Sequence, residues 1–316
     1  MYTSLNGDPR SKLSDLIHGT AHNPFTQRML VPVLSRTIHT MSPANVWEDI
    51  SSWLAQQPKF QKESKRLGWE IAFLPHYLIA LFLALLSLIG FTYTMRVLFA
   101  SMYETGPLVE KIVPLVALFG LPPFFNVGTH YIYDFTALFL FLLGAVLLFK
   151  QRWKYFYPVF IVGLLNKETM IMLSFLLLLV FHNNIARKSL VRHFVTQFAI
   201  FIAIKGLLVY TFASNPGTNL EFHLFGNIHD ILMPYSMSSF AIAMALLFLV
   251  FHDWKSKPIL LRQSLWLVAP FGALMICFAW LTEIRDAYEV YPFIFLLIVH
   301  TICFSIGRIP YHLKHF

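Results

Sequence analysis

The sequence predicts an all-α polytopic membrane protein with about nine membrane helices, several of them short. Three observations lead to this prediction. Of the 316 residues, 57% are hydrophobic and only 13% are charged, about half of the roughly 25% charge that is usual in soluble domains. The mean hydropathy is +0.62. Several apolar runs approach the roughly 20 residues that cross a bilayer. These features exclude a soluble enzyme, a secreted disulfide scaffold and a disordered binder.

The basic charge and the cysteines fit the same class. A net charge of +8 would indicate nucleic-acid binding in a soluble protein. In a membrane protein it reflects Lys and Arg held on the cytoplasmic side, so we expect no nucleic-acid partner. The two cysteines, Cys277 and Cys303, lie inside apolar runs, which predicts no disulfide framework. The sequence has no zinc spacing, no Walker loop and no dinucleotide-binding glycine motif.

Residues 1–70 form the first predicted domain, a polar outer-face segment with no run long enough to span a membrane. Ser42 and Pro43 predict a helix start, with Ser as the N-cap and Pro at the first position. Apolar residues then recur at helical spacing, and Trp47 and Trp53 suit an amphipathic helix in the membrane interface. Packing of this helix on the protein's own surface explains the pattern equally well.

Residues 71–316 form the second predicted domain, which is transmembrane. We expect its helices at 71–95, 112–125, 136–149, 155–166, 169–181, 194–213, 234–251, 263–281 and 290–306. Several of these segments are shorter than the usual span. Short helices are tolerated where they line a water-filled cavity, because their polar ends are then solvated.

The stretch 155–181 permits one long helix or two short ones with Asn166–Thr169 at the turn between them. The positive-inside rule decides between them. Two helices place nearly all the Lys and Arg beyond residue 70 on one side, with only Lys167 and Arg285 opposite, whereas one long helix scatters the charges over both sides. We therefore predict two helices, with the basic side and the C-terminus cytoplasmic.

This topology places residues 1–70 outside, although no signal peptide or membrane segment precedes them in the sequence. One explanation is translocation of the segment by the first helix. The other, which we favour, is a further membrane helix encoded upstream of Met1 or supplied by another membrane subunit.

Charged residues at the outer ends are candidates for binding a substrate. Lys167 and Glu168 lie between two apolar half-helices, where charges are costly unless they are paired or face water. They either bind a phosphate headgroup and a sugar hydroxyl or form an ion pair with each other. Glu283 and Arg285 lie at another outer mouth. Arg suits bidentate phosphate binding, whereas a local pair of Arg285 with Glu283 or Glu289 explains the pattern as well.

Further candidates lie in loops and in one helix. Asp134 stands where an outer loop enters a helix and suits an N-cap or a substrate contact. Lys205 is a cation midway along an expected span, where it binds a ligand or pairs with a neighbour. Asp8 and Asp15 are candidate general bases, because a loop carboxylate needs only to reach an acceptor hydroxyl. The loop 214–234 contains acidic and His residues without diagnostic metal spacing, so no metal ligand is predicted.

The chain resembles poorly characterised bacterial multi-pass membrane proteins of the GT-C glycosyltransferase-like class. Four short motifs carry the resemblance, which covers most of the chain: Asn-Pro-Phe-x-x-Arg-x-Leu-x-Pro at 23–32, Tyr-Asp-Phe at 133–135, Leu-Asn-Lys-Glu-Thr at 165–169 and Glu-x-Arg at 283–285. The resemblance implies a polyprenyl-phosphate-linked sugar donor and short helices around an outward cavity. It also implies an inner (plasma) membrane location and an acidic residue in the first outer loop as base or metal contact.

Carried over to this chain, the resemblance makes Asp8 or Asp15 the acidic loop residue, and Arg28, Lys167 and Arg285 the phosphate-facing cations. The expected function is transfer of a sugar from the polyprenyl-phosphate donor to an acceptor on the outer face. The expected partners are membrane lipid and the lipid-linked sugar. The resemblance leaves open whether a divalent metal ion is a cofactor. A polysaccharide polymerase or ligase, a transporter and a non-catalytic membrane subunit are the alternatives.

Overall fold

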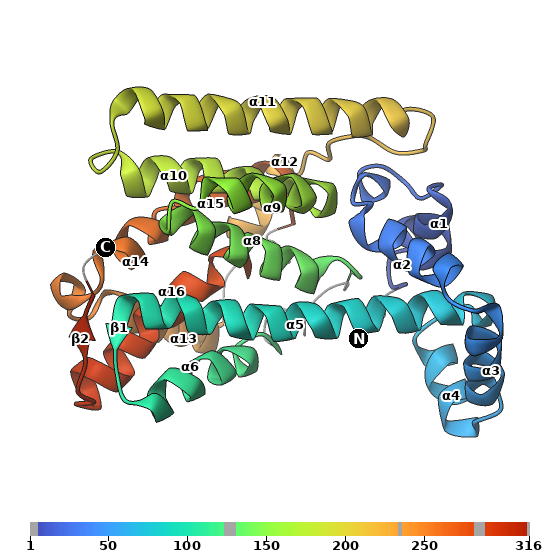
Figure 1. Cartoon of the computed structure of the whole chain (residues 1–316), viewed down its shortest axis with the longest axis horizontal. Coiled ribbons are helices and arrows are strands. Elements are labelled where there is room, and N and C mark those ends of the chain that lie inside the picture. The colour runs from blue at the N-terminus through green and yellow to red at the C-terminus, as the bar shows by residue number, and fades with distance from the viewer. Residues whose placement is uncertain (1–5, 123–130, 233–235, 281–287, 315–316) are drawn as a thin grey trace.

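The structure is a computed structural model, and it describes residues 6–122, 131–232, 236–280 and 288–314. Most of these residues are helical, and the longer helices lie side by side along the long axis of the molecule (Figure 1). Two strands of two residues each, β1 (Tyr103–Glu104) and β2 (His312–Leu313), pair in antiparallel fashion. This pairing, which the sequence does not predict, ties the end of the chain to the end of α5 (Leu74–Met102).

Helices of 6 to 29 residues follow one another along the chain. In chain order they are α1 (Leu13–His18), α2 (Leu30–Met41), α3 (Ala44–Ala55), α4 (Pro58–Arg66), α5 (Leu74–Met102), α6 (Pro107–Phe119), α8 (Asp134–Phe149), α9 (Trp153–Asn166), α10 (Met172–Phe181), α11 (Arg187–Thr211), α12 (Leu224–Leu232), α13 (Met237–Phe251), α14 (Ile259–Leu265), α15 (Val268–Phe278) and α16 (Tyr291–Val299). A π-helical segment, η7 (His300–Ile306), continues α16. Short 3-10 turns include η1 (Pro9–Ser11), η3 (Ile71–Phe73) and η4 (Glu168–Ile171).

Four helical stretches of the described chain are long and apolar enough to cross a membrane. They are Ile71–Met102, Arg187–Thr211, Ile259–Phe278 and Tyr288–Ile306. Shorter apolar helices are Asp134–Phe149, Glu168–Phe181 and Met237–Phe251. Within the described ranges, each of the nine predicted segments contains a helix. The described chain is thus mostly helical, with helices long and apolar enough for a membrane protein.

The structure confirms the predicted break in the stretch 155–181. Helix α9 ends at Asn166, Lys167 has an extended backbone (φ −157°, ψ 136°), and the chain resumes in η4 and α10. The junction between α10 and α11 lies at the same end of the molecule as β1 and β2, on the left of Figure 1, whereas α1 and α2 lie toward the opposite end.

Several helices begin or end at residues other than those predicted. Helix α11 begins at Arg187 rather than at 194, and its first residues, Arg187 and Lys188, are exposed and polar, so the apolar pattern does not include them. The predicted segment 263–281 begins earlier, at Ile259, and its helices α14 and α15 together form one stretch long enough to cross a membrane. Ser42 is the C-cap of α2, since its hydroxyl donates to the carbonyl oxygen of Ile38, and α3 begins only at Ala44.

Two groups of buried apolar side chains hold the molecule together. The larger group lies between α5, α8, α9, α10, α14 and α16 and includes Phe91, Phe141 and Phe293. The smaller group joins α1, Phe25 and α2 to Tyr77 of α5 and to residues 131–133. Each fully buried Leu or Phe contributes about 1.5–3 kcal/mol to the stability of the fold. Burial of the second group therefore stabilises the docking of the outer-face segment on one end of the helix bundle.

Candidate functional site

The loop after α11 fixes the Asn-Pro-Phe motif of the outer-face segment. The backbone N–H of Asn23 donates to the carbonyl oxygen of Pro216 at 2.8 Å, and its side-chain amide donates to that of Phe212 at 3.0 Å. Gly217 has a φ of +92°, and a Cβ atom there would lie 2.6 Å from the carbonyl oxygen of Asn23. Only glycine therefore allows this close approach.

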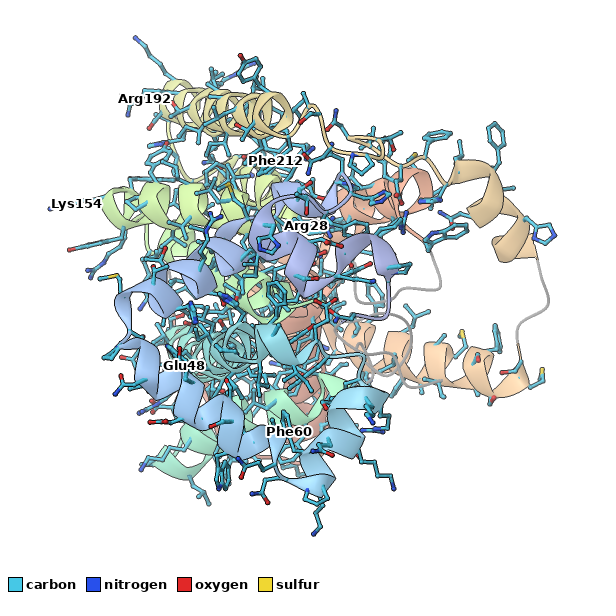
Figure 2. All side chains as sticks on the ribbon, turned by 90° about the vertical axis from the view of Figure 1, so that its right-hand side faces the viewer. Arg28, Glu48, Phe60, Lys154, Arg192 and Phe212 are labelled. Atoms are coloured by element: carbon cyan, nitrogen blue, oxygen red, sulfur yellow. The ribbon has the colours of Figure 1, made fainter. Side chains whose placement is uncertain are left out.

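Arg28 joins the outer-face segment to the membrane helices (Figure 2). Its Nη2 lies 2.6 Å from Oε1 of Glu168, and its Nε lies 3.3 Å from Oε2. The Nη1 group donates to the hydroxyl of Tyr133, and the guanidinium carbon lies 5.0 Å from the centre of the Tyr133 ring. Burial lowers the pKa of Arg28, but pairing with Glu168 and Tyr133 raises it well above its ordinary value. Arg28 is therefore a fixed cation.

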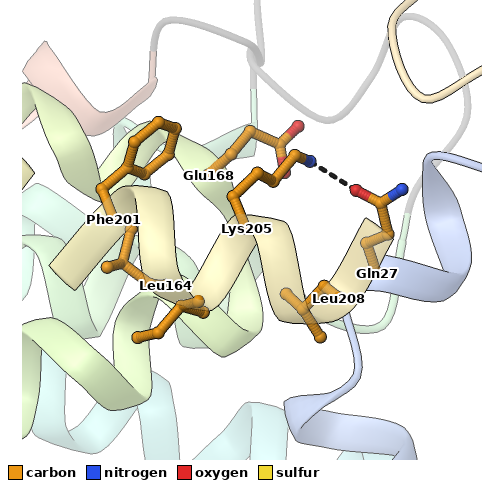
Figure 3. A pocket seen from close by; sticks show the side chains of 7 residues that line it. Gln27, Leu164, Glu168, Phe201, Lys205 and Leu208 are labelled. Carbon is orange, nitrogen blue, oxygen red and sulfur yellow. Dashed lines mark hydrogen bonds between the residues drawn. The ribbon is translucent and has the colours of Figure 1, made fainter. Parts of the chain in front are cut away.

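A second cation, Lys205, reaches the same place from α11. Its ammonium donates to Oε1 of Gln27, and it forms no ion pair within 4.0 Å among the described residues (Figure 3). These side chains and Glu168 line a small, narrow pocket together with Leu164, Phe201, Ile204 and Leu208. Arg28 and Lys205 thus place two positive charges around the single carboxylate of Glu168.

Lys205 lies nearer one end of its helix than the sequence predicts. Because α11 begins at Arg187, a rise of about 1.5 Å per residue places Lys205 about 27 Å along the helix axis. Six residues of α11 follow Lys205 before the helix ends at Thr211. Lys205 therefore lies in the last third of α11, and its ammonium reaches the docked segment at Gln27.

Lys167 and Glu168 do not form the mutual ion pair that was one of the two predictions for them. Lys167 pairs instead with Glu289, with 3.2 Å between Nζ and Oε1, and both side chains are buried. The hydroxyl of Thr169 donates to the same oxygen, and the Lys167 ammonium lies 4.4 Å from the centre of the Tyr288 ring. The extended backbone at Lys167 directs neighbouring side chains to opposite sides, which is why the two charges separate.

Asp134 is the first residue of α8 and is buried. Its Oδ2 accepts a hydrogen bond from the backbone N–H of Tyr131 at 3.0 Å, which stabilises the turn into the helix. The neighbouring carbonyl oxygen of Tyr133 accepts from the side-chain amide of Asn166 at 3.0 Å. The predicted N-cap role of Asp134 is wrong, because the N-cap of α8 is Tyr133 and Asp134 binds the turn before the helix instead.

Arg10 engages the predicted base Asp8. The Nη2 and Nε atoms of Arg10 lie 2.9 and 3.1 Å from the Asp8 carboxylate, and the Arg10 backbone N–H also donates to it. Burial raises the pKa of Asp8, but these bonds to Arg10 outweigh it and hold the pKa below its ordinary value. The guanidinium groups of Arg10 and Arg28 lie 5.2 and 5.8 Å from the centre of the Phe25 ring, so Phe25 links the partner of Asp8 to Arg28.

The other candidates lie apart from this cluster or outside the description. Asp15 lies in α1 with a half-buried side chain. Glu283 and Arg285 lie outside the described residues. Glu221 binds Arg10 at 2.6 Å and lies 3.3 Å from His223, and among the described residues no three His, Cys, Asp or Glu side chains are grouped to hold a metal ion.

Sequence reasoning missed three participants, namely Gln27, the Tyr133 hydroxyl and Arg10. Gln27 and Tyr133 lie inside the quoted motifs. The sequence could not indicate their partners, because the atoms that they contact belong to residues more than 100 positions away in the chain. Arg10 follows Asp8 by two residues, and that short spacing was the available signal.

Compared with known proteins, the chain matches no protein-family model, no curated protein and no solved structure. The function must therefore be argued from the site itself.

Proposed function

We propose that the chain is an integral-membrane glycosyltransferase with about nine crossings, the cluster of Arg28, Glu168 and Lys205 outside, and the C-terminus in the cytoplasm of a bacterial cell. It transfers a sugar from a polyprenyl-phosphate donor to an acceptor on the outer face of the plasma membrane. Arg28 and Lys205 hold the donor phosphate, and Asp8 is the base.

The observation that carries this proposal is the ammonium of Lys205. It lies in the last third of a helix that is long and apolar enough to cross a membrane, beside a small pocket, and its hydrogen-bond acceptor is the neutral amide of Gln27. A charge at such a depth is costly unless it has a partner or a function. A phosphate oxygen supplies the missing negative charge, and Arg28, 2.6 Å from Glu168, completes a cationic surface for it.

In the proposed reaction, the Asp8 carboxylate takes the proton of the acceptor hydroxyl. The acceptor oxygen then forms a bond to the anomeric carbon of the sugar as the bond from that carbon to the phosphate oxygen breaks. The leaving polyprenyl phosphate keeps the electron pair, and the fixed cations stabilise its developing charge. Asp8 must first be released from Arg10, because a carboxylate held by a guanidinium is a weak base.

A sugar-transfer assay tests the proposal. Native membranes containing the wild type, Lys205→Gln or Lys188→Gln are incubated with a panel of radiolabelled polyprenyl-phosphate sugars, and loss of label from the donor is measured. Lys188 is the matched control, since it is a lysine at the other end of α11. We expect transfer with the wild type and Lys188→Gln and at least a tenfold loss with Lys205→Gln. Equal rates in all three would refute the role of Lys205, and no transfer from any donor would refute the function.

A non-catalytic membrane subunit is the second candidate, and two observations favour it. Asp8 is already engaged by Arg10, and the described part of α13 exposes apolar side chains such as Phe240 and Ile242 along most of its length. A subunit of this kind would keep its partner when Lys205 is replaced. Co-purification of the same partner with wild type and Lys205→Gln, without sugar transfer by either, supports it.

A further inference from the structure

Helices α3 and α4 form a hairpin that projects from the outer end of the bundle. Both run across the direction of α5, beyond its first residues (Figure 1), and Glu48 and Phe60 mark them at the margin of the molecule in Figure 2. If α5 spans the bilayer, a helix perpendicular to it lies parallel to the membrane surface. The hairpin is therefore placed at the level where lipid headgroups begin.

An apolar stripe on α3 is left uncovered by the described chain. Val46, Ile50 and Trp53 follow one another at helical spacing, and their side chains are 41, 38 and 61% exposed. None of the α3 residues with a described side chain is buried. This finding argues against packing of the apolar face on the protein's own surface, which was one of the two predictions for this helix.

The hairpin is also separated from the bundle by a groove. About 880 Å³ of empty space, counting its open side, lies between the end of α2, α3 and the beginning of α5. The lining includes Trp47 and Ser51 of α3 and Ile71 and Pro75 beside or within α5. The groove side of α3, with Trp47 and Ser51, is half-buried, whereas the apolar stripe on its other side is exposed, as are apolar side chains of α5 such as Phe82.

Helix α4 is strongly basic. It carries Lys59, Lys62, Lys65 and Arg66, all exposed, against one acid, Glu63, which lies 2.6 Å from Arg66. An interfacial helix pair that combines a Trp-containing apolar stripe with exposed cations binds lipid by burying apolar area and by attracting anionic headgroups. Of the candidate occupants, a lipid surface matches both features and continues the lipid-facing surface of α5.

We propose that the α3–α4 hairpin docks on the outer surface of the bilayer, with the stripe Val46–Ile50–Trp53 in the interface and the α4 lysines on anionic phospholipid headgroups. This docking holds the outer-face segment at a fixed height above the membrane. It does not depend on the proposed reaction, because a scaffold subunit would dock in the same way.

Spin-label accessibility in the full chain tests the depth of α3. In a background with Cys277→Ser and Cys303→Ser, a nitroxide is placed at Ile50→Cys or, as the matched control, at Ser52→Cys. Ser52 is exposed and lies about 200° around the same helix. In vesicles of phosphatidylcholine with phosphatidylglycerol, we expect relaxation by oxygen to exceed relaxation by a water-soluble nickel chelate at position 50, and the reverse at position 52.

Two results would overturn the depth assignment. Equal access of the nickel chelate to both positions would place the stripe in water. Protection of position 50 from both oxygen and nickel would show that another protein or a second copy covers it.

The binding of anionic headgroups by the α4 lysines is tested separately. We expect the oxygen preference at position 50 to weaken at least twofold in pure phosphatidylcholine, and to weaken equally in mixed vesicles when Lys59, Lys62 and Lys65 are all replaced by Gln. A preference that does not respond to phosphatidylglycerol or to the three lysines would contradict the role of anionic lipid.

Discussion

The ion pair between Arg28 and Glu168 joins segments 140 residues apart, so its contribution to stability measures the docking of the outer-face segment on the bundle. We consider Arg28→Met, Glu168→Gln and the double variant. Loss of one partner of a fully buried pair costs about 3–5 kcal/mol. Here the side chains are 14 and 34% exposed, and solvent at Glu168 reduces the cost. We expect each single variant to lose about 2–3 kcal/mol of unfolding free energy.

The double-mutant cycle isolates the pair itself. Arg28 also binds the Tyr133 hydroxyl, and that loss appears in both Arg28 variants and cancels in the cycle. We expect a coupling energy of about 1.5–2 kcal/mol between Arg28 and Glu168. The assay is reversible unfolding in mixed detergent micelles, followed by circular dichroism, with the same variants at one protein concentration.

The pair between Arg66 and Glu63 provides a matched control. Its N–O distance is also 2.6 Å, but the side chains are 49 and 48% exposed, and such surface pairs contribute only about 0.2–1 kcal/mol. The reasoning is refuted if the coupling of Arg28 with Glu168 is no larger than the coupling of Arg66 with Glu63.

Three further predictions follow from single residues. Gly217→Ala should lower the Tm, since the new Cβ would meet the Asn23 carbonyl and φ at this residue is positive. Gly206→Ala, with open space around it, should instead stabilise α11 by about 0.5–1 kcal/mol. Thermal unfolding of both variants checks this. Lys257→Met should lower the free energy of unfolding in detergent by about 2–4 kcal/mol, because the buried ammonium of Lys257 donates to three main-chain carbonyls of α13 and α16. An unchanged free energy of unfolding would contradict this prediction. Asp8 stabilises the fold at pH values above its ordinary pKa near 3.9, and because its folded pKa is lower, this stabilisation is lost as pH falls through that lower value. The Tm gap between wild type and Asp8→Asn should therefore close on acidification, and a gap that is constant with pH would contradict the assignment.

The apolar pattern predicts the helices of the membrane region well, because each helix must present enough apolar surface to lipid or to the core. The break at Lys167 was also predictable, since the distribution of Lys and Arg on the two sides allows only a split. The start of α11 was not, because Arg187 and Arg192 belong to a helix whose first turns lie outside the apolar run. A change from apolar to polar residues marks where a helix leaves the hydrocarbon, whereas the helix itself continues beyond that point.

The site was predictable in composition but not in pairing. Lys167 and Glu168 were candidates because charges between apolar half-helices need a partner or water, and Arg28 was a candidate through the resemblance alone. The partners themselves, Glu168 for Arg28 and Glu289 for Lys167, come from distant parts of the chain. A single sequence carries no distance information between such parts, so the only ion pair considered for Lys167 and Glu168 was the one with each other, as the alternative to binding a phosphate and a sugar hydroxyl.

Mass spectrometry of co-purified lipid tests the central claim, an anion site for a lipid phosphate at the outer end of α11, most directly. The wild type, Lys205→Gln and the control Lys188→Gln are purified in mild detergent from the same host, and the retained lipids are identified. We predict a polyprenyl-phosphate species with the wild type and with Lys188→Gln, and its loss with Lys205→Gln. Bulk phospholipid alone in all three samples, or the same polyprenyl phosphate retained by Lys205→Gln, would contradict the claim.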